Sequence, residues 1–433
     1  MYMDTIKVGL LGLGTVGTGV AKVLQNNQDS ITKKVGKPVE LAKILVRNKD
    51  KQRNLSVPTE ILTDNPEDLL ADPEINIIVE VMGGIQPTKD YIIKALENGK
   101  HVVTANKDLL AIHGKELFAA AENKHNDLFF EASVAGGIPI IRPLKECLAG
   151  NRLEQVMGII NGTTNYILTK MTLEGSDFNE VLKEAQELGY AEEDPSSDIE
   201  GFDAARKIAI LASVAFCTRV TFSDVFVEGI TNITVEDIQY AKDLGYVIKL
   251  LGIAKSINGY VEVRVHPAFI PKNHPLATVN DAYNAIFVKG DAIGEAMFFG
   301  QGAGELPTAS AIVGDIVAAA RDIAYGVTGR ISCTCFEDKP IIEIGKLRSE
   351  YYLRLKVADK PGVLASIASV FGNHDVSIAS VLQKSMGNNG KAEIVLITHV
   401  VTENSVRDAL QIIGGMSIVD TISNVIRVEG GNK

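Results

Sequence analysis

Six carboxylates and a lysine are concentrated in one short stretch in the middle of the chain. Residues 189–207 read GYAEEDPSSDIEGFDAARK and precede an almost wholly apolar run, IAILASVAF. A solvated helix would not carry such a run, so its first turns lie at the edge of a core. Asp203 and Lys207 are four residues apart and share a helical face. The cluster suits a ligand with an ammonium group; the alternative is an exposed ion pair worth a few tenths of a kcal/mol.

A second pattern lies near the N-terminus, where GLGTVG follows the strand-like segment IKVGLL and opens a helix. Glycines at this spacing permit a tight turn, a close approach of the backbone to a pyrophosphate, and close packing of helix on strand. The helix N-terminus then faces the anion. The alternative is a tight turn without a ligand. We predict a dinucleotide site formed by Gly12, Leu13, Gly14, Thr15, Val16 and Gly17.

The end of the second strand indicates which dinucleotide binds. An NAD site usually has Asp or Glu there, which accepts hydrogen bonds from the ribose 2′-hydroxyl. This chain has Arg47 instead, with Lys49 beyond it and no acid before Asp50. Cations suit a 2′-phosphate, so NADP is favoured and NAD remains possible. The alternative is that Arg47 only ends a strand in solvent.

Two further segments lie at the ends of predicted strands: MGG at 82–84 follows the strand 75–81, and TANK at 104–107 lies just beyond the strand 101–104. In an open parallel sheet the ligand crevice lies outside the carboxyl ends of the strands, which brings these segments to the nicotinamide. An amine there can serve as a general acid or base; the alternative is that Lys107 lies on the surface. We therefore add Gly83, Thr104 and Lys107 to the cofactor site.

The elements that position these residues follow from periodicity. Strand-like and helix-like segments alternate through the first 131 residues, which predicts parallel βαβ units in a doubly wound, Rossmann-like sheet. A less regular α+β section with Gly-rich loops follows. Then 331–349 is a predicted linker, and 350–429 has the order βαββαβ of a ferredoxin-like module. The predicted domains are 1–131 for the dinucleotide, 132–330 for catalysis and dimerisation, and 350–429; the helix near Thr308–Tyr325 is expected to pack back on the first domain.

Composition excludes several classes of function. The 433 residues carry 43 basic and 54 acidic side chains, a net charge of −11, without a basic tract. A role that depends on neutralising nucleic-acid phosphates is therefore not expected. No uninterrupted apolar run approaches the roughly 20 residues that a bilayer requires. Four cysteines in so long a chain predict reduced thiols, and with them a cytoplasmic protein.

The chain resembles homoserine dehydrogenase. The matching segments, in the family's order, are LLGLGTVGTG, VEVMGG, TANKDLLA, FEASVAGGIPI, GIINGTTNYIL and GYAEEDPSSDIEGFDAARK. The C-terminal module resembles an ACT domain through DKPGVLASIASVF. No aspartate kinase segment precedes Ile6, so the resemblance is to the monofunctional form.

The resemblance implies reversible reduction of L-aspartate 4-semialdehyde to L-homoserine with NAD(P)H, within threonine, methionine and isoleucine biosynthesis. It makes Lys207 the proton donor to the aldehyde oxygen and places Lys107 between cofactor and substrate. Asp203 and Glu192 would hold the amino acid, with support from Asp198. Gly189 completes the cofactor set, together with Gly302, whose loop is expected to approach from the second domain.

The resemblance also implies a monovalent cation, expected to be sodium. Its ligands would be Glu131 and the carbonyls of Val134, Gly136 and Ile138, and oxygen ligands of this kind suit a hard cation. The alternative is a Gly-rich hinge without an ion. The NGTT segment at 161–164 either lines the pocket or is only a turn.

In relatives, ACT domains pair across subunits and bind amino acids at loops such as 359–362 and 373–376. Threonine is the expected effector, and a homodimer or homotetramer is expected. The alternative for this module is dimerisation without a ligand. Two other functions remain open for the whole chain: an amino-acid sensor that keeps a dinucleotide fold, and a 2-hydroxy-acid dehydrogenase. The latter would need an arginine clamp and a His–Asp pair, which the seven histidines do not suggest.

Overall fold

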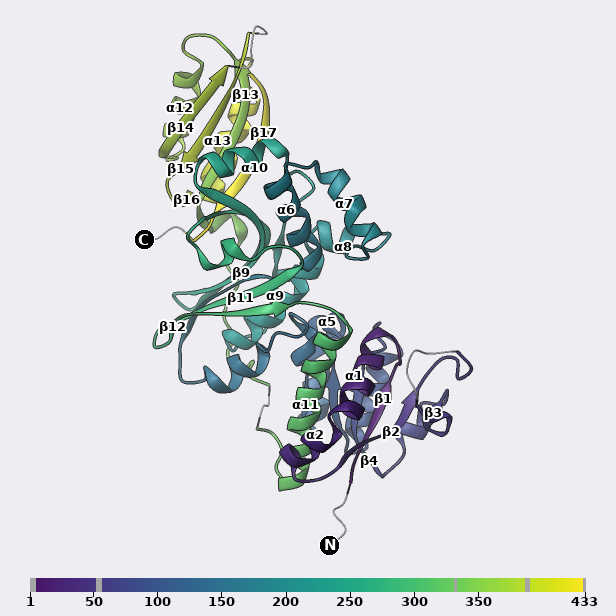
Figure 1. The fold of residues 1–433 in the computed structure, drawn as a ribbon. Helices are drawn as coiled ribbons and strands as arrows, with labels where there is room; N and C mark the ends of the chain where they lie inside the picture. Colours follow the sequence, from purple (N-terminus) through teal and green to yellow (C-terminus); the bar gives the residue numbers. More distant parts are fainter. Residues whose placement is uncertain (1–4, 52–56, 331–332, 386–389, 431–433) are drawn as a thin grey trace. The chain divides into compact units, whose positions relative to one another are not determined.

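The computed structural model describes residues 5–51, 57–330, 333–385 and 390–430, and is shown in Figure 1. The chain divides into two compact units. The first comprises 1–156, 206–225 and 283–339, and the second comprises 157–205, 226–282 and 340–433. Each unit therefore contains several separate segments of the chain. The domain boundaries expected from the sequence stay predictions.

The first unit contains a six-stranded parallel sheet in the order β3-β2-β1-β4-β5-β6. This is the strand order of a doubly wound dinucleotide-binding fold, which confirms the predicted fold class. Its elements are β1 (Ile6–Leu11), α1 (Thr15–Asn26), α2 (Gln28–Val35), β2 (Val39–Leu45), β3 (Leu62–Thr63), α3 (Glu67–Leu70), β4 (Ile75–Glu80), α4 (Thr88–Glu97), β5 (His101–Thr104), α5 (Lys107–Asn123) and β6 (Leu128–Phe129).

The central strands β1, β4 and β5 are almost fully buried, as expected of apolar strands in a parallel sheet that helices cover on both faces, whereas β2 is only partly buried. One of these helices comes from far along the chain. In α11 (Glu305–Tyr325), the apolar residues Ala309, Ile312 and Ile316 belong to the same hydrophobic core as β1 and β2. A Cβ at Gly19 of α1 would lie 2.5 Å from the carbonyl oxygen of Glu305, so the two helices pack closely (Figure 1).

The same unit holds the antiparallel pair β11 (Tyr283–Gly290) and β12 (Gly294–Gln301). The chain passes between the two units along β7 (Leu153–Ile159) and along α9 (Phe202–Ala215). The two strands pair along their whole length, from Tyr283 with Gln301 to Gly290 with Gly294.

The second unit contains the strand order β9-β10-β17-β13-β15-β14. Its elements are α6 (Gly162–Glu174), α7 (Phe178–Glu187), α8 (Ser196–Ile199), β8 (Phe226–Val227), α10 (Val235–Asp243), β9 (Tyr246–Ile257), β10 (Tyr260–Pro271), β13 (Arg348–Ala358), α12 (Val363–Asn373), β14 (Ile378–Ser385), β15 (Lys391–Thr398), β16 (Val401–Thr402), α13 (Glu403–Gly414) and β17 (Val419–Val428). Apart from the two-residue β16, the last elements follow the predicted βαββαβ order.

Both faces of β13 are buried, although its sequence alternates. Tyr351 and Leu353 belong to the apolar core beneath α12 and α13. On the other face, Arg354 Nε donates to Asp237 of α10 at 2.8 Å, and the Tyr352 hydroxyl donates to the same carboxylate at 3.0 Å. The polar side of this strand therefore binds a helix of its own unit through hydrogen bonds to a fully buried carboxylate.

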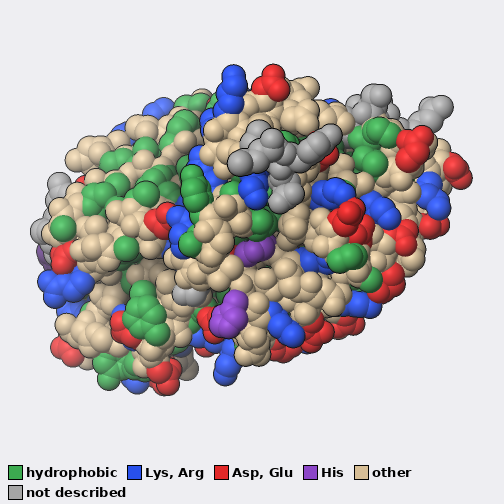
Figure 2. Space-filling model, turned by 90° about the horizontal axis from the view of Figure 1, so that it is seen from below, with side chains coloured by type: hydrophobic (Ala, Val, Ile, Leu, Met, Phe, Trp, Pro, Cys, Tyr) green, Lys and Arg blue, Asp and Glu red, His purple; other side chains and the backbone are tan. Residues whose placement is uncertain are grey.

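On the face seen in Figure 2, Lys and Arg side chains are interspersed with Asp and Glu, and several acidic side chains lie along its lower right edge. That face has no continuous basic patch. Among the helices of the described residues, none combines the length and apolar character needed to span a membrane.

Candidate active site

The glycine turn after β1 is shaped by contacts that only glycine allows. Gly12 adopts a φ of +104°. A Cβ at Gly17 would lie 2.2 Å from the Gly12 carbonyl oxygen, and a Cβ at Gly12 would lie 3.1 Å from Cα of Met82. Helix α1 begins with Gly14 at its N-cap, so no side chain caps its first N–H groups. These N–H groups are thus available to an anion, as a pyrophosphate site requires.

A buried carboxylate holds the neighbouring turn. Glu80, at the end of β4, accepts hydrogen bonds from the backbone N–H of Met82 at 2.9 Å and Gly83 at 3.0 Å. The Thr104 hydroxyl, at the end of β5, donates to the same carboxylate at 2.6 Å. Burial raises the pKa of Glu80, while these donors act in the opposite direction. Glu80 therefore joins the carboxyl ends of two adjacent strands.

The start of α5 is fixed to the same region. Asn106 caps the helix by accepting a hydrogen bond from Leu109 N at 3.1 Å, and its amide donates to the Gly84 carbonyl at 2.7 Å. Lys107 is the first residue of α5 and is half-buried. The predicted cofactor residues Gly83, Thr104 and Lys107 consequently lie at one edge of the sheet, at the carboxyl ends of β4 and β5.

Helix α9 reaches the start of α5 through an ion pair. Arg206 Nε lies 2.9 Å from a carboxylate oxygen of Asp108. Lys107 precedes Asp108 and Lys207 follows Arg206, so each candidate catalytic lysine is the chain neighbour of one member of this pair. Lys207 is half-buried, as Lys107 is. The ion pair thus brings together the helix turns that carry the two lysines.

In the second unit, a single amide holds two of the predicted substrate carboxylates. The Asn161 amide donates to Asp198 at 2.6 Å and to Asp203 at 3.0 Å. Its oxygen accepts from Thr164 N at 2.9 Å, which caps α6. Asp203 is 8% exposed and Asp198 is half-buried, whereas the Glu192 side chain is exposed. Two carboxylates that share one donor form a negatively charged site that suits an ammonium group.

The loop after β6 contains the predicted cation ligands. The Glu131 carboxylate accepts hydrogen bonds from Ile140 N at 2.5 Å, Ile141 N at 2.7 Å and Arg142 N at 2.9 Å. Within the described part of the chain, no cluster of three or more His, Cys, Asp or Glu side chains could hold a metal. Carboxylate ligands alone therefore do not form a metal site here.

The backbone of this loop fits a cation better than its side chains do. Val134, Gly136 and Ile138 are buried, and no described donor reaches their carbonyl oxygens. Pro139, which has no N–H group, follows Ile138. Buried carbonyls without donors are costly unless something pairs with them, and a hard cation is a suitable partner.

Three family models match the chain. They are described as "Homoserine dehydrogenase, NAD binding domain" at residues 12–131, "Homoserine dehydrogenase" at 139–317 and "ACT domain" at 351–414. The homoserine dehydrogenase of Bacillus subtilis is 47% identical over 99% of both chains, and that of Corynebacterium glutamicum is 43% identical over 98% of this chain and 96% of the relative. The chain belongs to the homoserine dehydrogenase family.

Solved structures lead to the same family assignment. A homoserine dehydrogenase from Thiobacillus denitrificans superposes with a TM-score of 0.93 at 45% identity over 99% of both chains. A Staphylococcus aureus enzyme gives 0.79 at 39% identity over 99% of this chain and all of that chain. A hyperthermophilic archaeal homoserine dehydrogenase mutant in complex with NADPH gives a TM-score of 0.62 at 27% identity, and the match covers 73% of this chain and 97% of that chain. The predicted class, an NAD(P)-dependent oxidoreductase of this family, is confirmed, as is the ACT domain.

Several predicted residues are accounted for by packing alone. A Cβ at Gly302 would lie 2.0 Å from the Asn284 amide nitrogen, and one at Gly136 would lie 2.4 Å from the Gly302 carbonyl oxygen. Glycine at 302 is therefore required for loop packing whether or not it approaches a cofactor. Gly189 has a φ of +76°, which explains glycine at the end of α7 in the same way.

Arg47 is exposed beyond the end of β2, and no described residue forms an ion pair with it. Its neighbour Lys49 lies 3.0 Å from Asp64, and that ion pair lowers the pKa of Asp64. Of the two cations at this strand end, Arg47 is therefore the one without an ion-pair partner among the described residues.

Sequence reasoning missed Glu80 and left Asn161 undecided. Glu80 belongs to the largely apolar segment INIIVEV, and an acid in such a strand signals a buried hydrogen-bonding role. The NGTT segment proves to be the cap and first turn of α6, and its Asn161 amide also binds Asp198 and Asp203. An asparagine before a helix predicts the cap, but nothing in the sequence indicates the contacts to carboxylates 37 and 42 positions away.

Proposed function

We propose that the chain catalyses reversible hydride transfer between NADPH and L-aspartate 4-semialdehyde, with L-homoserine as the reduced product. The observation that carries the proposal is the ion pair between Asp108 and Arg206, because it joins the helix turns that contain Lys107 and Lys207. Amines beside the crevice of a doubly wound sheet are suitably located for proton transfer at the nicotinamide.

The acidic residues bind the amino-acid end of the substrate. Asp203 and Asp198 accept hydrogen bonds from the α-ammonium group, and Asn161 keeps both carboxylates oriented toward it. Glu192, whose side chain is exposed, adds a third negative charge to this acidic segment. Fixing the substrate at its charged end leaves the aldehyde carbon to be oriented toward the cofactor, which lowers the entropic part of the barrier.

Lys207 donates the proton to the aldehyde oxygen as that oxygen gains charge, and it accepts the proton in the oxidative direction. Lys107 lies between cofactor and substrate and stabilises the same developing charge. When bound, the nicotinamide supplies the hydride. No protein nucleophile is needed, so the protein contributes a proton donor and a rigid arrangement of the reactants.

The cofactor is held mainly by backbone. A pyrophosphate fits the uncapped N–H groups of α1 and the surface that Gly14 leaves open, since no atom lies within 4 Å of a Cβ there. Arg47 binds the 2′-phosphate and favours NADPH over NADH. The whole set is Gly12, Leu13, Gly14, Thr15, Val16, Gly17, Arg47, Gly83, Thr104, Lys107, Gly189 and Gly302.

A monovalent cation, sodium, binds at Glu131 and the carbonyls of Val134, Gly136 and Ile138. The lack of described donors to the three loop carbonyls supports this part of the proposal. A cation there would fix the loop against Gly302, whose carbonyl lies directly beside Gly136. Its role is therefore to hold the loop in shape.

The ACT module binds threonine at the loops 359–362 and 373–376 and inhibits the enzyme. Gly362, with a φ of +89°, directly precedes α12, which leaves a helix N-terminus without a side-chain cap at the first of these loops. An amino-acid carboxylate suits such a position. We further propose a homodimer or homotetramer in the cytoplasm that serves threonine, methionine and isoleucine biosynthesis.

The deciding experiment combines the full-length protein with NADPH and aspartate semialdehyde and follows absorbance at 340 nm. We expect NADPH oxidation coupled to formation of homoserine, identified by chromatography. A protein that binds NADPH and amino acids but gives no turnover would instead be a sensor. The exposed lysine variant Lys183→Ala should have normal turnover and serves as the control for lysine substitutions.

A further inference from the structure

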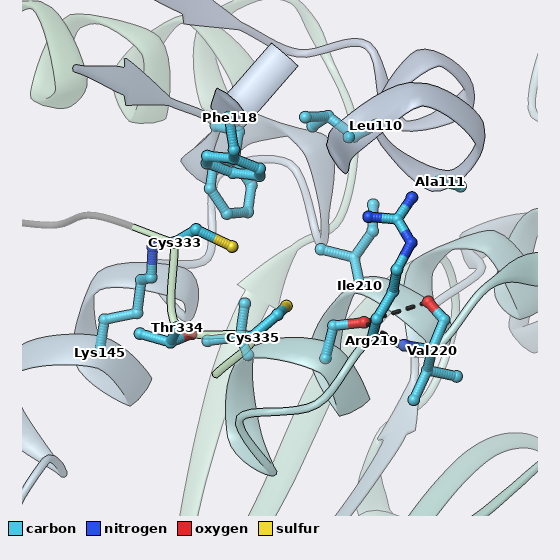
Figure 3. A pocket seen from close by; sticks show the side chains of 14 residues that line it. Leu110, Ala111, Phe118, Lys145, Ile210, Arg219, Val220, Cys333, Thr334 and Cys335 are labelled. Atoms are coloured by element: carbon cyan, nitrogen blue, oxygen red, sulfur yellow. Dashed lines mark hydrogen bonds between the residues drawn. The ribbon is translucent and has the colours of Figure 1, made fainter. Parts of the chain in front are cut away.

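A small cavity lies in the first unit, beside α5 and α9, the helices that carry the two candidate catalytic lysines. It has a volume of about 60 Å³. Helix α5 contributes Leu110 and Phe118 to its lining, α9 contributes Ile210, and the segment 333–335 contributes both of its cysteines (Figure 3). Most of the lining is apolar. The cavity is not part of the proposed substrate site, which the acidic residues form.

Two cationic side chains, Lys145 and Arg219, line this cavity. The amine of Lys145 lies 5.3 Å from the ring centroid of Phe130 and 5.8 Å from that of Phe118. The two rings meet edge to face, with centroids 5.5 Å apart. Burial lowers the pKa of Lys145, and the charges of Cys333 and Cys335 counteract that effect. A cation is therefore held on two aromatic faces next to two thiols.

The two thiols are unequal because each affects the titration of the other. The neighbouring Cys335 thiol lowers the pKa of Cys333 to about 6, with a further contribution from Lys145. The proximity of Cys333 and burial raise the pKa of Cys335. Both sulfur atoms point into the cavity in Figure 3. Thiolate character, access and a neighbouring thiol are the features of a redox-reactive cysteine.

We propose that Cys333 and Cys335 form a redox-active dithiol that reacts with neutral low-molecular-weight disulfides entering this cavity. The Cys333 thiolate attacks one sulfur of the disulfide RSSR, which forms a mixed disulfide and releases RS⁻. Cys335 then loses its proton to solvent and attacks the Cys333 sulfur, which releases the second RS⁻. The dithiol is oxidised by two electrons, RSSR is reduced to two RSH, and the thiolates take up the two protons.

Oxidation should also affect turnover, and this part rests on the proposed function. A disulfide brings two sulfur atoms to about 2.05 Å, so the segment 333–335 must shift against the cavity wall. That wall includes Leu110 and Ile210, each three residues after Lys107 or Lys207. A shift of either helix changes the separation of the two amines, and small displacements of catalytic groups are costly.

The first test measures Cys333 directly, without reference to activity. The full-length protein is alkylated with iodoacetamide from pH 5 to 9, and the rate at each cysteine is followed by peptide mass spectrometry. We expect a midpoint near pH 6 for Cys333. The pH midpoint of Cys333 alkylation should rise in the variants Lys145→Gln and Cys335→Ala. It should be unchanged in Lys145→Arg and in the control Cys147→Ser. A midpoint near the ordinary thiol value of about 8.5 would overturn the proposal.

The second test uses 2-hydroxyethyl disulfide at pH 7. We expect loss of two hydrogens per chain, a peptide linked through Cys333 and Cys335, and reversal by dithiothreitol. A stable mixed disulfide on Cys333, or a disulfide involving Cys147 or Cys217, would overturn the proposal. Turnover is measured on the same samples and should fall as the linked peptide forms. A linked peptide with unchanged turnover would disprove only the coupling to the helices, whereas absent turnover before oxidation would disprove the proposed function.

Discussion

The cofactor turn and the substrate carboxylates are held in place by different means. The turn from Gly12 to Gly17 is fixed by backbone sterics, because a single methyl group at Gly17 would overlap a carbonyl oxygen at 2.2 Å. Asp198 and Asp203 are instead fixed by hydrogen bonds from the Asn161 side chain, which lies 37 and 42 positions away. One region is local in sequence and the other is assembled by the fold.

This difference suggests that substitutions in the cofactor region and in the substrate region have different effects. A backbone cradle binds the phosphates that any dinucleotide carries, so it needs little besides glycine and a helix N-terminus. Two carboxylates held by one amide recognise a particular charged group of the substrate. Displacing any one of these three side chains alters that recognition. Substitutions in the first region should therefore damage cofactor binding together with folding, and those in the second should alter substrate handling while the fold remains intact.

The largest effect is expected from Lys207→Ala, which removes the proton donor on the helix that also carries Asp203. Loss of a general acid lowers kcat by about 10²- to 10⁴-fold, while the Kd for NADPH should stay as in the wild type. Steady-state kinetics and fluorescence titration of NADPH measure the two quantities. A kcat within a few-fold of the Lys183→Ala control would refute the role of Lys207.

Gly17→Ala should break the cofactor region itself. Overpacking lowers the free energy of unfolding by about 1–3 kcal/mol, so the Tm should fall, and the displaced turn should also bind NADPH more weakly. Gly14→Ala provides the comparison, because no atom lies within 4 Å of the added methyl group. That variant should keep its Tm and still bind NADPH more weakly. Equal Tm values for both variants would show that backbone sterics do not fix the turn.

Asn161→Ala tests the substrate region. Losing hydrogen bonds to charged groups costs about 1.5–3 kcal/mol, so we expect the KM for aspartate semialdehyde to rise about tenfold or more with little change in the KM for NADPH. Asn165→Ala is the matched control, since the amide of this buried α6 residue donates to the Val279 and Asp281 carbonyls. A similar rise in KM for both variants would indicate general damage to α6.

Arg47→Asp should have the smallest effect. An exposed ion pair contributes about 0.2–1 kcal/mol. Loss of the attraction between Arg47 and the 2′-phosphate should therefore lower the ratio of kcat/KM for NADPH over that for NADH by up to about fivefold. Repulsion between the new carboxylate and the phosphate should lower the ratio somewhat further. Parallel assays with both cofactors give the ratio. An unchanged ratio would mean that Arg47 does not contact the 2′-phosphate.

The features that the sequence predicts correctly are those that are local in the chain, like the cofactor turn. The parallel sheet, the glycine turn and the order of the ACT module depend on patterns within a few residues, and these were predicted correctly. The segment 16–28 has the spacing of a single helix, but the structure has two helices that meet at Asn27, a break with no proline or glycine to mark it. The two-residue strand β3 is too short to have a period.

Contacts between distant segments were not predictable. The buried carboxylate of Glu80, the Asn161 amide and the ion pair of Asp108 with Arg206 each depend on which segments the fold brings together. The residues themselves are common types at unremarkable spacings. Their functions emerge only when the burial and partners of each side chain are known, because a hydrogen bond across 24 or more positions leaves no local pattern.

The central claim is that Lys207 and the carboxylates clamped by Asn161 act on the same substrate molecule beside the nicotinamide. A crystal structure of the full-length protein with NADP and L-homoserine tests it most directly. We predict Lys207 Nζ within about 2.6–3.2 Å of the homoserine hydroxyl oxygen, with the α-ammonium group on Asp203 and Asp198. Homoserine bound elsewhere, with Lys207 directed into bulk solvent away from the cofactor, would contradict the account.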